Sequence, residues 1–258
     1  MRRNGRVPGR RKAIVLLLFL VLITLGIASL ANRWKGELQV ERLDVRGCRI
    51  LTEKEVITLA NVPIGRPLYD VDLVTVRSRL RTSPYVRDAV VVHDLPSTIK
   101  IAIKERTPIA ILGSPEPFYI SDEGYVLPSV SSKEVFDLPV ITGLSDTKPL
   151  KVGMKIESEN FKAAVEILTE AATLDRDLYH LISEINLSGV GPTVYTAEHG
   201  IPILFDRERI HTQLVYLQGF WNQYVRQQGL EQVSSIDLRF EDQVVVCWNK
   251  PISQEKSL

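Results

Sequence analysis

The sequence has little of what enzymes use for chemistry. Its 258 residues include two cysteines and four histidines, which stand apart at His93, His180, His199 and His211. No two histidines have the i,i+4 spacing of a helical metal site, and the phosphate-loop, dinucleotide, zinc-protease, nucleophile-elbow and CxxC motifs are absent. We therefore expect no catalytic residue, metal or cofactor, and a binding or scaffold protein is favoured.

The two cysteines, Cys48 and Cys247, stand about two hundred residues apart in apolar stretches typical of strands. An oxidising compartment would allow a disulfide bond between them. Their apolar surroundings instead favour two buried free thiols.

Acidic residues are missing from the first twelve positions, and charge of either sign is missing from Ala13 to Ala31. Nineteen helical residues span about 28 Å, close to the ~30 Å hydrocarbon core of a bilayer. The segment before this run carries six cations, against only Arg33 and Lys35 just after it. This imbalance predicts a cytoplasmic N-terminus. Residues 1–12 are expected to be a cytoplasmic basic tail, 13–31 a transmembrane helix and 32–37 a linker.

A cleaved signal peptide is the alternative, because Ser29-Leu30-Ala31 resembles a small-x-small cleavage site. The apolar run exceeds the about 7–15 residues of a signal core, which favours the uncleaved anchor.

Without the basic tail, the chain keeps 26 basic and 31 acidic side chains, a net charge of −5. This deficit of cations argues against nucleic-acid binding.

The first folded region is predicted to have the order β-α-α-β-β over residues 38–107. Alternating apolar residues predict strands, and Thr52 with Glu55 forms a capping box at the start of a helix. Asp72 caps a second helix. The predicted elements are a strand at 38–47, helices after Thr52 and after Asp72, and strands at 86–95 and 99–103.

The second region, residues 108–250, is predicted to be a mixed β-rich domain with two helices, which gives the chain an α+β fold. One helix of about sixteen residues carries Phe161, and the other runs from Asp206, as its cap, to about Gln227. Short strands are predicted near 109–112, 117–120, 125–127, 138–143, 182–188, 193–197, 201–205, 236–240 and 244–248. Residues 251–258 are expected to be a flexible tail.

Several short segments along the chain form a distinctive combination. They include Pro67-Leu68-Tyr69-Asp70-Val71-Asp72, Ser83-Pro84-Tyr85-Val86, Leu95-Pro96-Ser97-Thr98-Ile99-Lys100-Ile101, Glu105-Arg106-Thr107-Pro108, Asp122-Glu123-Gly124-Tyr125-Val126, Leu138-Pro139-Val140-Ile141-Thr142-Gly143 and Ile236-Asp237-Leu238-Arg239-Phe240. Through these segments nearly the whole chain resembles the FtsQ/DivIB family of bacterial cell-division proteins, and the first region is similar to that family's POTRA domain. The chain departs from the family at Glu241-Asp242-Gln243, where a glycine is common, and at Phe205-Asp206, in place of Leu-Gly.

The resemblance implies a non-enzymatic scaffold at the division septum, in the cell inner membrane, with its C-terminal domain in the periplasm. FtsB/DivIC-like and FtsL-like proteins would be its partners, and other septal proteins would bind the POTRA module. Through these partners, the scaffold would help control septal peptidoglycan synthesis. A POTRA-containing chaperone for outer-membrane or secreted proteins is one alternative. A membrane-anchored cell-wall enzyme is another.

The last predicted strand is the candidate binding site. It is apolar on both faces, and an open apolar edge invites pairing with another chain. We expect a partner strand to add to this edge, with Phe240 and Trp248 as aromatic anchors and Arg239 paired with a partner carboxylate. The predicted contact residues are Arg239, Phe240, Val244, Val245, Val246 and Trp248. The strand could instead lie inside the domain's own sheet.

Overall fold

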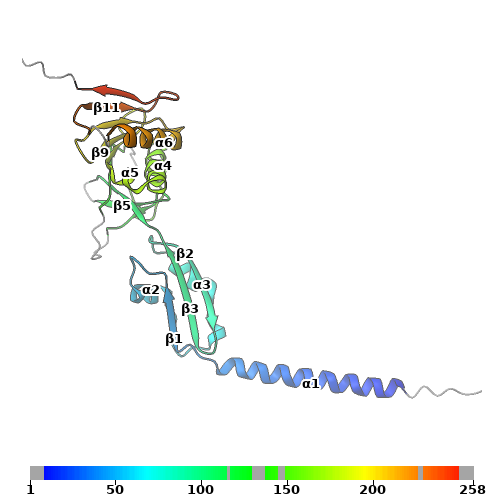
Figure 1. Ribbon diagram of the computed structural model, residues 1–258. Helices are drawn as coiled ribbons and strands as arrows, with labels where there is room; N and C mark the ends of the chain where they lie inside the picture. Colours follow the sequence, from blue (N-terminus) through cyan, green and yellow to red (C-terminus); the bar gives the residue numbers. More distant parts are fainter. Residues whose placement is uncertain (1–8, 115–116, 130–136, 145–148, 226–228, 250–258) are drawn as a thin grey trace, which may run out of the picture. The chain divides into compact units, whose positions relative to one another are not determined.

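The computed structural model describes residues 9–114, 117–129, 137–144, 149–225 and 229–249, without the side chains of 9–13 and 30–37. The chain forms two compact units, Met1–Glu105 and Arg106–Leu258 (Figure 1). Each unit has its own buried hydrophobic cluster.

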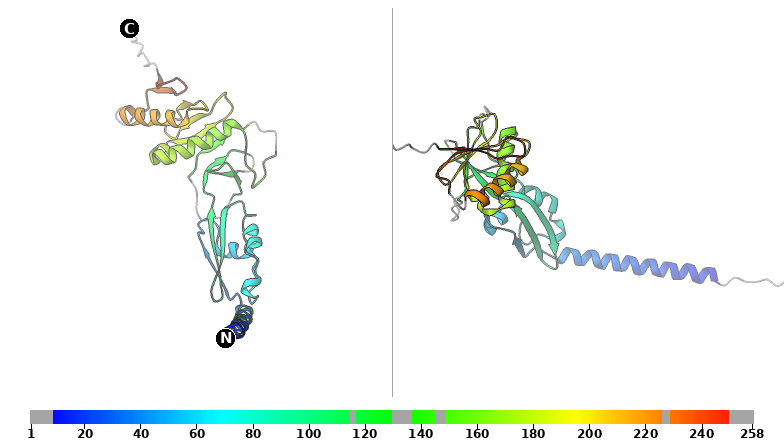
Figure 2. Two further views of the ribbon diagram at one scale, coloured as in Figure 1. Left: turned by 90° about the vertical axis from the view of Figure 1, so that its right-hand side faces the viewer. Right: turned by 45° about the horizontal axis from the view of Figure 1, so that its top comes forward.

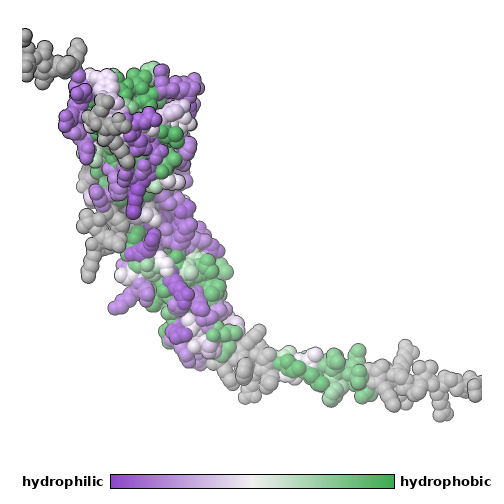
Figure 3. All heavy atoms as spheres, in the orientation of Figure 1, coloured by the Kyte–Doolittle hydropathy of each residue, from purple (hydrophilic) through white to green (hydrophobic). Residues whose placement is uncertain are grey.

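The first unit begins with one long helix, α1 (Gly9–Glu37). The described side chains of this helix, residues 14–29, are all exposed and mostly apolar (Figure 3). Within the described part of the chain, no helix has both the length and the apolar character needed to cross a bilayer. Helical backbone continues through residues 32–37, the segment expected to link the apolar run to the first folded module.

The β-α-α-β-β module follows, with a 3-10 turn between its helices. Its elements are β1 (Arg42–Arg46), α2 (Glu53–Ala60), η1 (Leu68–Asp70), α3 (Leu73–Leu80), β2 (Val86–Asp94) and β3 (Thr98–Glu105). The sheet order is β1-β3-β2, with β3 parallel to β1 and antiparallel to β2. The predicted order of elements is thus confirmed.

Local sequence explains where these helices begin. The Thr52 hydroxyl accepts a hydrogen bond from the Glu55 N–H, and the Glu55 carboxylate accepts one from the Thr52 N–H at 2.7 Å. Asp72 accepts from the N–H groups of Val74 and Thr75. Both predicted caps are confirmed, and each satisfies donors that a helix start leaves unpaired. Tyr85, expected in the core, is 3% exposed.

The second unit holds a sheet of nine described strands. They are β4 (Pro108–Leu112), β5 (Phe118–Ser121), β6 (Val126–Leu127), β7 (Val140–Thr142), β8 (Ile182–Asn186), β9 (Thr193–Thr196), β10 (Pro202–Leu204), β11 (Val233–Asp237) and β12 (Val245–Trp248). Their spatial order is β12-β11-β10-β9-β8-β7-β4-β5-β6. The helices are α4 (Glu159–Leu174), α5 (Arg176–His180) and α6 (Ile210–Phe220), followed by a π-helical turn, η2 (Trp221–Val225).

Helices α4 and α6 lie side by side against the sheet (Figure 2), and their apolar side chains join the core of the unit. Two helices were predicted here, and the short helix α5 was missed. The predicted start of the last helix was also wrong, because α6 begins at Ile210. Asp206 accepts from the N–H groups of Glu208 and Arg209, and it therefore caps a turn that precedes the helix. The predicted end near Gln227 lies outside the described residues.

Both cysteines are free, but neither is fully buried. Cys48 is half-buried in the first unit, and Cys247 is exposed on β12. The expectation of two buried thiols was therefore wrong. Partial burial raises the pKa of the Cys48 thiol, and the nearby Glu105 carboxylate adds to this rise.

Candidate functional site

The last strand, β12, lies at the edge of the nine-stranded sheet. It pairs with β11 on one side in an antiparallel register that places Val246 opposite Ile236 and Val245 opposite Asp237. No strand among the described residues pairs with its other side. One row of backbone donors and acceptors on β12 thus lacks a partner strand within this sheet.

The register identifies which backbone groups point away from β11. The Asn249 N–H donates to the Gln232 carbonyl at 2.7 Å, so Asn249 faces β11. In an antiparallel pair, the direction of the backbone bonds alternates from one residue to the next. Val245 and Cys247 therefore also bond toward β11, and the N–H and C=O groups of Val246 and Trp248 face the open side.

The side chains of β12 also alternate. Val244 and Val246 pack against the core of the unit. The Trp248 ring meets the Tyr224 ring edge-on, with centroids 4.9 Å apart. This face of the strand therefore rests on its own domain, and Cys247 on the opposite face is exposed. The strand, predicted to be apolar on both faces, thus packs one of those faces against its own domain.

Phe240 lies outside any strand, in the connection between β11 and β12, and is 49% exposed. The connection turns at Asp242, whose backbone is left-handed with φ of 54°. The Tyr216 hydroxyl on α6 donates to the Asp242 carboxylate at 3.0 Å and fixes this turn to the helix. The hairpin thus forms without a glycine, because aspartate tolerates this backbone conformation better than most residues.

Arg239 already has a carboxylate partner in its own chain. Its Nε and Nη2 atoms donate to the two oxygens of Asp237, at 2.9 and 2.6 Å. These hydrogen bonds lower the pKa of Asp237 and raise the pKa of Arg239. The bidentate geometry that Arg239 could offer to a partner protein is therefore used inside the hairpin. A carboxylate on the partner would have to share Arg239 with Asp237 or displace Asp237 from it.

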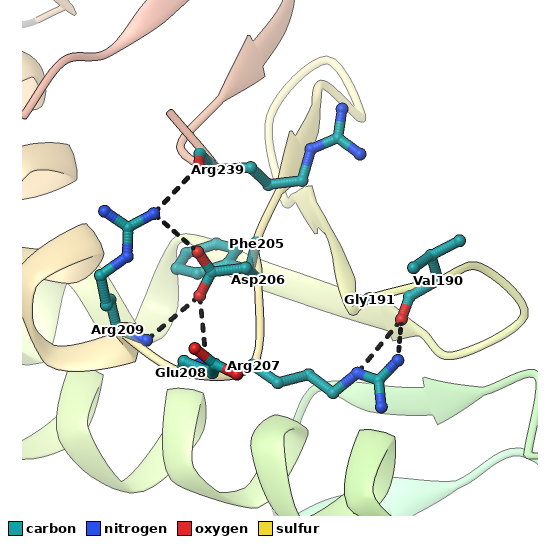
Figure 4. Close-up of a pocket in the computed structure, with 8 residues that line it drawn as sticks. All are labelled: Val190, Gly191, Phe205, Asp206, Arg207, Glu208, Arg209 and Arg239. Atoms are coloured by element: carbon teal, nitrogen blue, oxygen red, sulfur yellow. Dashed lines mark hydrogen bonds and ion pairs between the residues drawn. The ribbon is translucent and has the colours of Figure 1, made fainter. Parts of the chain in front are cut away.

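Next to this pair lies an open pocket of about 480 Å³, where β10 and β11 end and α6 begins (Figure 4). The Arg207 Nη2 atom donates to the Val190 carbonyl at 2.6 Å. The Arg209 Nη2 atom donates to both the Asp206 carboxylate and the Arg239 carbonyl, each at 3.0 Å. Burial acts to raise the pKa of Asp206, but the hydrogen bonds from Glu208 and Arg209 outweigh it and lower that pKa. The pocket therefore presents three guanidinium groups held in place by acceptors.

Reasoning from the sequence missed several residues of this site. Asp237 ends β11 and Arg239 follows two residues later, and this spacing could have indicated their pairing. Tyr216 and Tyr224 reach the hairpin from α6 and the turn after it, and Arg207 lines the adjacent pocket; no local pattern marks these contacts. Within the described residues, no group of three or more His, Cys, Asp or Glu side chains could hold a metal ion.

Comparison with known proteins gives the family. A profile described as POTRA domain, FtsQ-type, matches residues 38–106, and one described as FtsQ/DivIB, C-terminal related, matches residues 107–247. The chain is 29% identical to a cell division protein FtsQ of Rhodothermus marinus, over 99% of this chain and 94% of the relative. It is 28% identical to a cell division protein FtsQ of a Geobacter species, over 81% of this chain and 76% of the relative. A third relative, a cell division protein FtsQ of Streptomyces coelicolor, is 34% identical over 54% of this chain and 53% of the relative. The chain belongs to the FtsQ/DivIB family of cell-division proteins.

Proposed function

We propose that this chain is a non-enzymatic scaffold of the division machinery, held in the inner membrane, whose strand β12 accepts a strand from an FtsB/DivIC-like partner. An FtsL-like protein joins the same assembly, and the assembly helps to control septal peptidoglycan synthesis. The observation that carries the proposal is the edge of β12 with which no described strand pairs, near the exposed ring of Phe240.

The chemistry of the edge suits strand addition. The outward backbone groups of Val246 and Trp248 can form the main-chain hydrogen bonds that give such complexes their affinity, while side-chain pockets give specificity. Phe240 and Trp248 flank the strand at its two ends and are 49% and 46% exposed. Aromatic side chains at the centre of an interface often contribute most of the binding energy. The contact residues remain those predicted: Arg239, Phe240, Val244, Val245, Val246 and Trp248.

The arginine pocket extends this surface beyond the strand. Arg239 is neutralised by Asp237, and Arg209 by Asp206. Arg207 differs, because in the described part of the chain its hydrogen bonds go to the Val190 carbonyl. A carboxylate on the partner would form charge-assisted hydrogen bonds with Arg207 without displacing an acidic side chain. Arg239 stays among the proposed contact residues, and we add Arg207 as the guanidinium that pairs with a carboxylate on the partner.

The membrane anchor rests on the run from Ala13 to Ala31, on the basic tail before it and on the exposed apolar side chains of α1. The N-terminus would lie in the cytoplasm and the second unit in the periplasm, at the division septum. A reporter fused after Leu258, active only in the periplasm, tests this topology. A mature N-terminus at Asn32 would show instead that a signal peptide is cleaved.

The division of the chain at about residue 107 is part of the same proposal. Residues 38–107 would be the POTRA domain, available to other septal proteins, and residues 108–250 the β domain that binds the FtsB-like partner. The boundary between the two compact units and the limits of the two family profiles support this division.

In-cell photocrosslinking tests the docking edge. A photoreactive residue replaces Phe240 in the full-length chain, and a matched control replaces Val152, an exposed apolar residue near β6 at the opposite edge of the sheet. We expect crosslinks to an FtsB-like protein from position 240 and none from position 152. The proposal fails if a chain that supports division gives no crosslink from position 240.

A further inference from the structure

Three exposed apolar side chains gather on two loops of the POTRA domain. Ile64 and Tyr69 belong to the loop between α2 and α3 and are 61% and 44% exposed. Leu95 belongs to the turn between β2 and β3 and is 61% exposed. The Tyr69 ring lies edge-on against His93, at 5.3 Å between centroids, so the α2–α3 loop contacts the end of β2, two residues before Leu95. We name Ile64, Tyr69 and Leu95 the rim.

Both loops hold the segment that leaves α1. The Leu68 N–H donates to the carbonyl of Leu38, the first residue after the helix, at 2.7 Å. The Gly65 N–H donates to the Val40 carbonyl, and the Glu41 N–H donates to the Ser97 carbonyl, both at 2.8 Å. The rim therefore belongs to the end of the domain at which the chain enters from α1.

The length of chain between the apolar run and this segment is short. Residues 32–37 are helical, and six helical residues rise about 9 Å. The headgroup layer on each side of the hydrocarbon core is about 5–8 Å thick. If Ala31 marks the end of the core, Leu38 lies at the outer boundary of the headgroups, and the loops bonded to the entering segment lie at the same depth.

The chemistry of the rim suits that depth. Tyrosine is enriched at membrane interfaces, because its ring is apolar and its hydroxyl is polar. Arg66 and Arg42 are exposed on the same loop and on the entering strand, where they can meet lipid phosphates. Two of the acidic side chains nearby are partly satisfied, since Asp94 pairs with Lys100 at 2.9 Å and Glu41 accepts from Ser97 at 2.7 Å, while Asp70 beside Tyr69 is exposed.

We propose that the rim is a membrane-contact surface, with Ile64, Tyr69 and Leu95 inserted among phospholipid headgroups on the periplasmic side. This inference rests on the membrane anchor proposed above. The contact would tie the POTRA domain to the bilayer surface and restrict its rotation about the anchor, which would fix the face that it presents to other septal proteins.

The test uses the full-length chain in phospholipid vesicles. Cys48→Ala and Cys247→Ser remove the native thiols, and Leu95→Cys carries an environment-sensitive fluorophore. Arg81→Cys is the matched control, since it is exposed and lies beyond the other end of β2, whose nine residues separate the two sites by about 30 Å. We expect a blue shift at position 95 and quenching by lipids that carry a quencher near the headgroup, with neither at position 81. Ile64→Ser with Tyr69→Ser should reduce the quenching at position 95.

Extraction with alkaline carbonate separates failure of the anchor from failure of the rim. A chain that leaves the vesicles in carbonate overturns both. A chain that stays in the membrane, with position 95 quenched no more than position 81, overturns the rim alone. A blue shift without lipid quenching also overturns it, because a second copy of the chain would then cover the rim.

Discussion

The Trp248 ring in the last strand contacts the Tyr224 ring in the turn after α6, with centroids 4.9 Å apart and an angle of 62° between the planes. Edge-on aromatic pairs of this kind contribute about 0.5–1.5 kcal/mol beyond their buried area. Trp248 therefore supports its own domain as well as the proposed interface. Neither Trp248 nor Phe240 belongs to the core cluster of the unit, but among the described residues Phe240 has no ring contact of the kind that Trp248 makes with Tyr224.

This difference separates two alanine variants. Burial of an aromatic side chain is worth about 1.5–3 kcal/mol, so Phe240→Ala should weaken partner binding about ten- to hundredfold without lowering the unfolding temperature. Trp248→Ala should weaken both binding and the fold. Titration with the partner and thermal unfolding measure the two effects. Unchanged affinity in both variants, or affinity that falls only in step with unfolding, would rule out the edge.

A pair of proline variants tests the backbone contacts. Proline has no N–H and is tolerated on edge strands where that group faces solvent. Val246→Pro removes an outward N–H, so it should abolish partner binding while the hairpin persists. Val245→Pro removes an inward N–H and should unpair β12 from β11. The account is wrong if Val246→Pro binds the partner normally.

The hairpin turn gives a prediction about stability. Tyr216→Phe removes the hydrogen bond to Asp242 and should cost about 0.5–1.5 kcal/mol of unfolding free energy. Asp242→Gly loses the same bond but relieves a left-handed backbone, so its net effect should be smaller. In the Asp242→Gly background, Tyr216→Phe should have almost no further effect. Chemical denaturation of all four proteins checks this, and additive losses would exclude the bond as the cause.

The Asp237–Arg239 pair predicts an acid-sensitive hairpin. The folded-state pKa of Asp237 is lowered by hydrogen bonds from Arg239. Because an unfolded aspartate titrates near pH ~3.9, this stabilisation is complete above that value and is lost as the pH falls through the lower folded pKa. Asp237→Asn should be less stable at neutral pH, and its stability should fall less than that of the parent protein as the pH drops below the unfolded-state pKa of ~3.9. If the unfolding free energies of the variant and the parent protein, plotted against pH, ran parallel, this prediction would be contradicted.

Gly47 tests whether the two units are independent. Its φ is +91°, and a Cβ at this position would overlap the carbonyl oxygen of Ile103. Gly47→Ala should therefore unfold or strongly destabilise the POTRA module and leave the second unit folded. Amide exchange resolved by region can follow both. Collapse of the second unit together with the first would show that the proposed domains do not fold separately.

The features predictable from the sequence were those with a local cause. Thr52 and Asp72 cap their helices through bonds to residues two or three positions away, and both caps were read correctly. The hydrogen bonds of Asp206 have an equally local cause, but they cap a turn that precedes α6. The capping pattern at Asp206 therefore predicted a helix start that is too early. The exposure of Cys247 depends on where β12 falls in the sheet. The contacts of Tyr216 and Tyr224 depend on how α6 packs, which no spacing along the chain encodes.

Amide exchange on the full-length protein, with and without an FtsB-like partner, tests the central claim most directly. In the free protein, the N–H groups of Val245 and Cys247 should exchange slowly because they bond toward β11, and those of Val246 and Trp248 should exchange quickly. Binding should slow exchange at Val246 and Trp248 and leave Val245 and Cys247 nearly unchanged. If the partner binds while Val246 and Trp248 keep exchanging quickly, the edge of β12 is not where it docks.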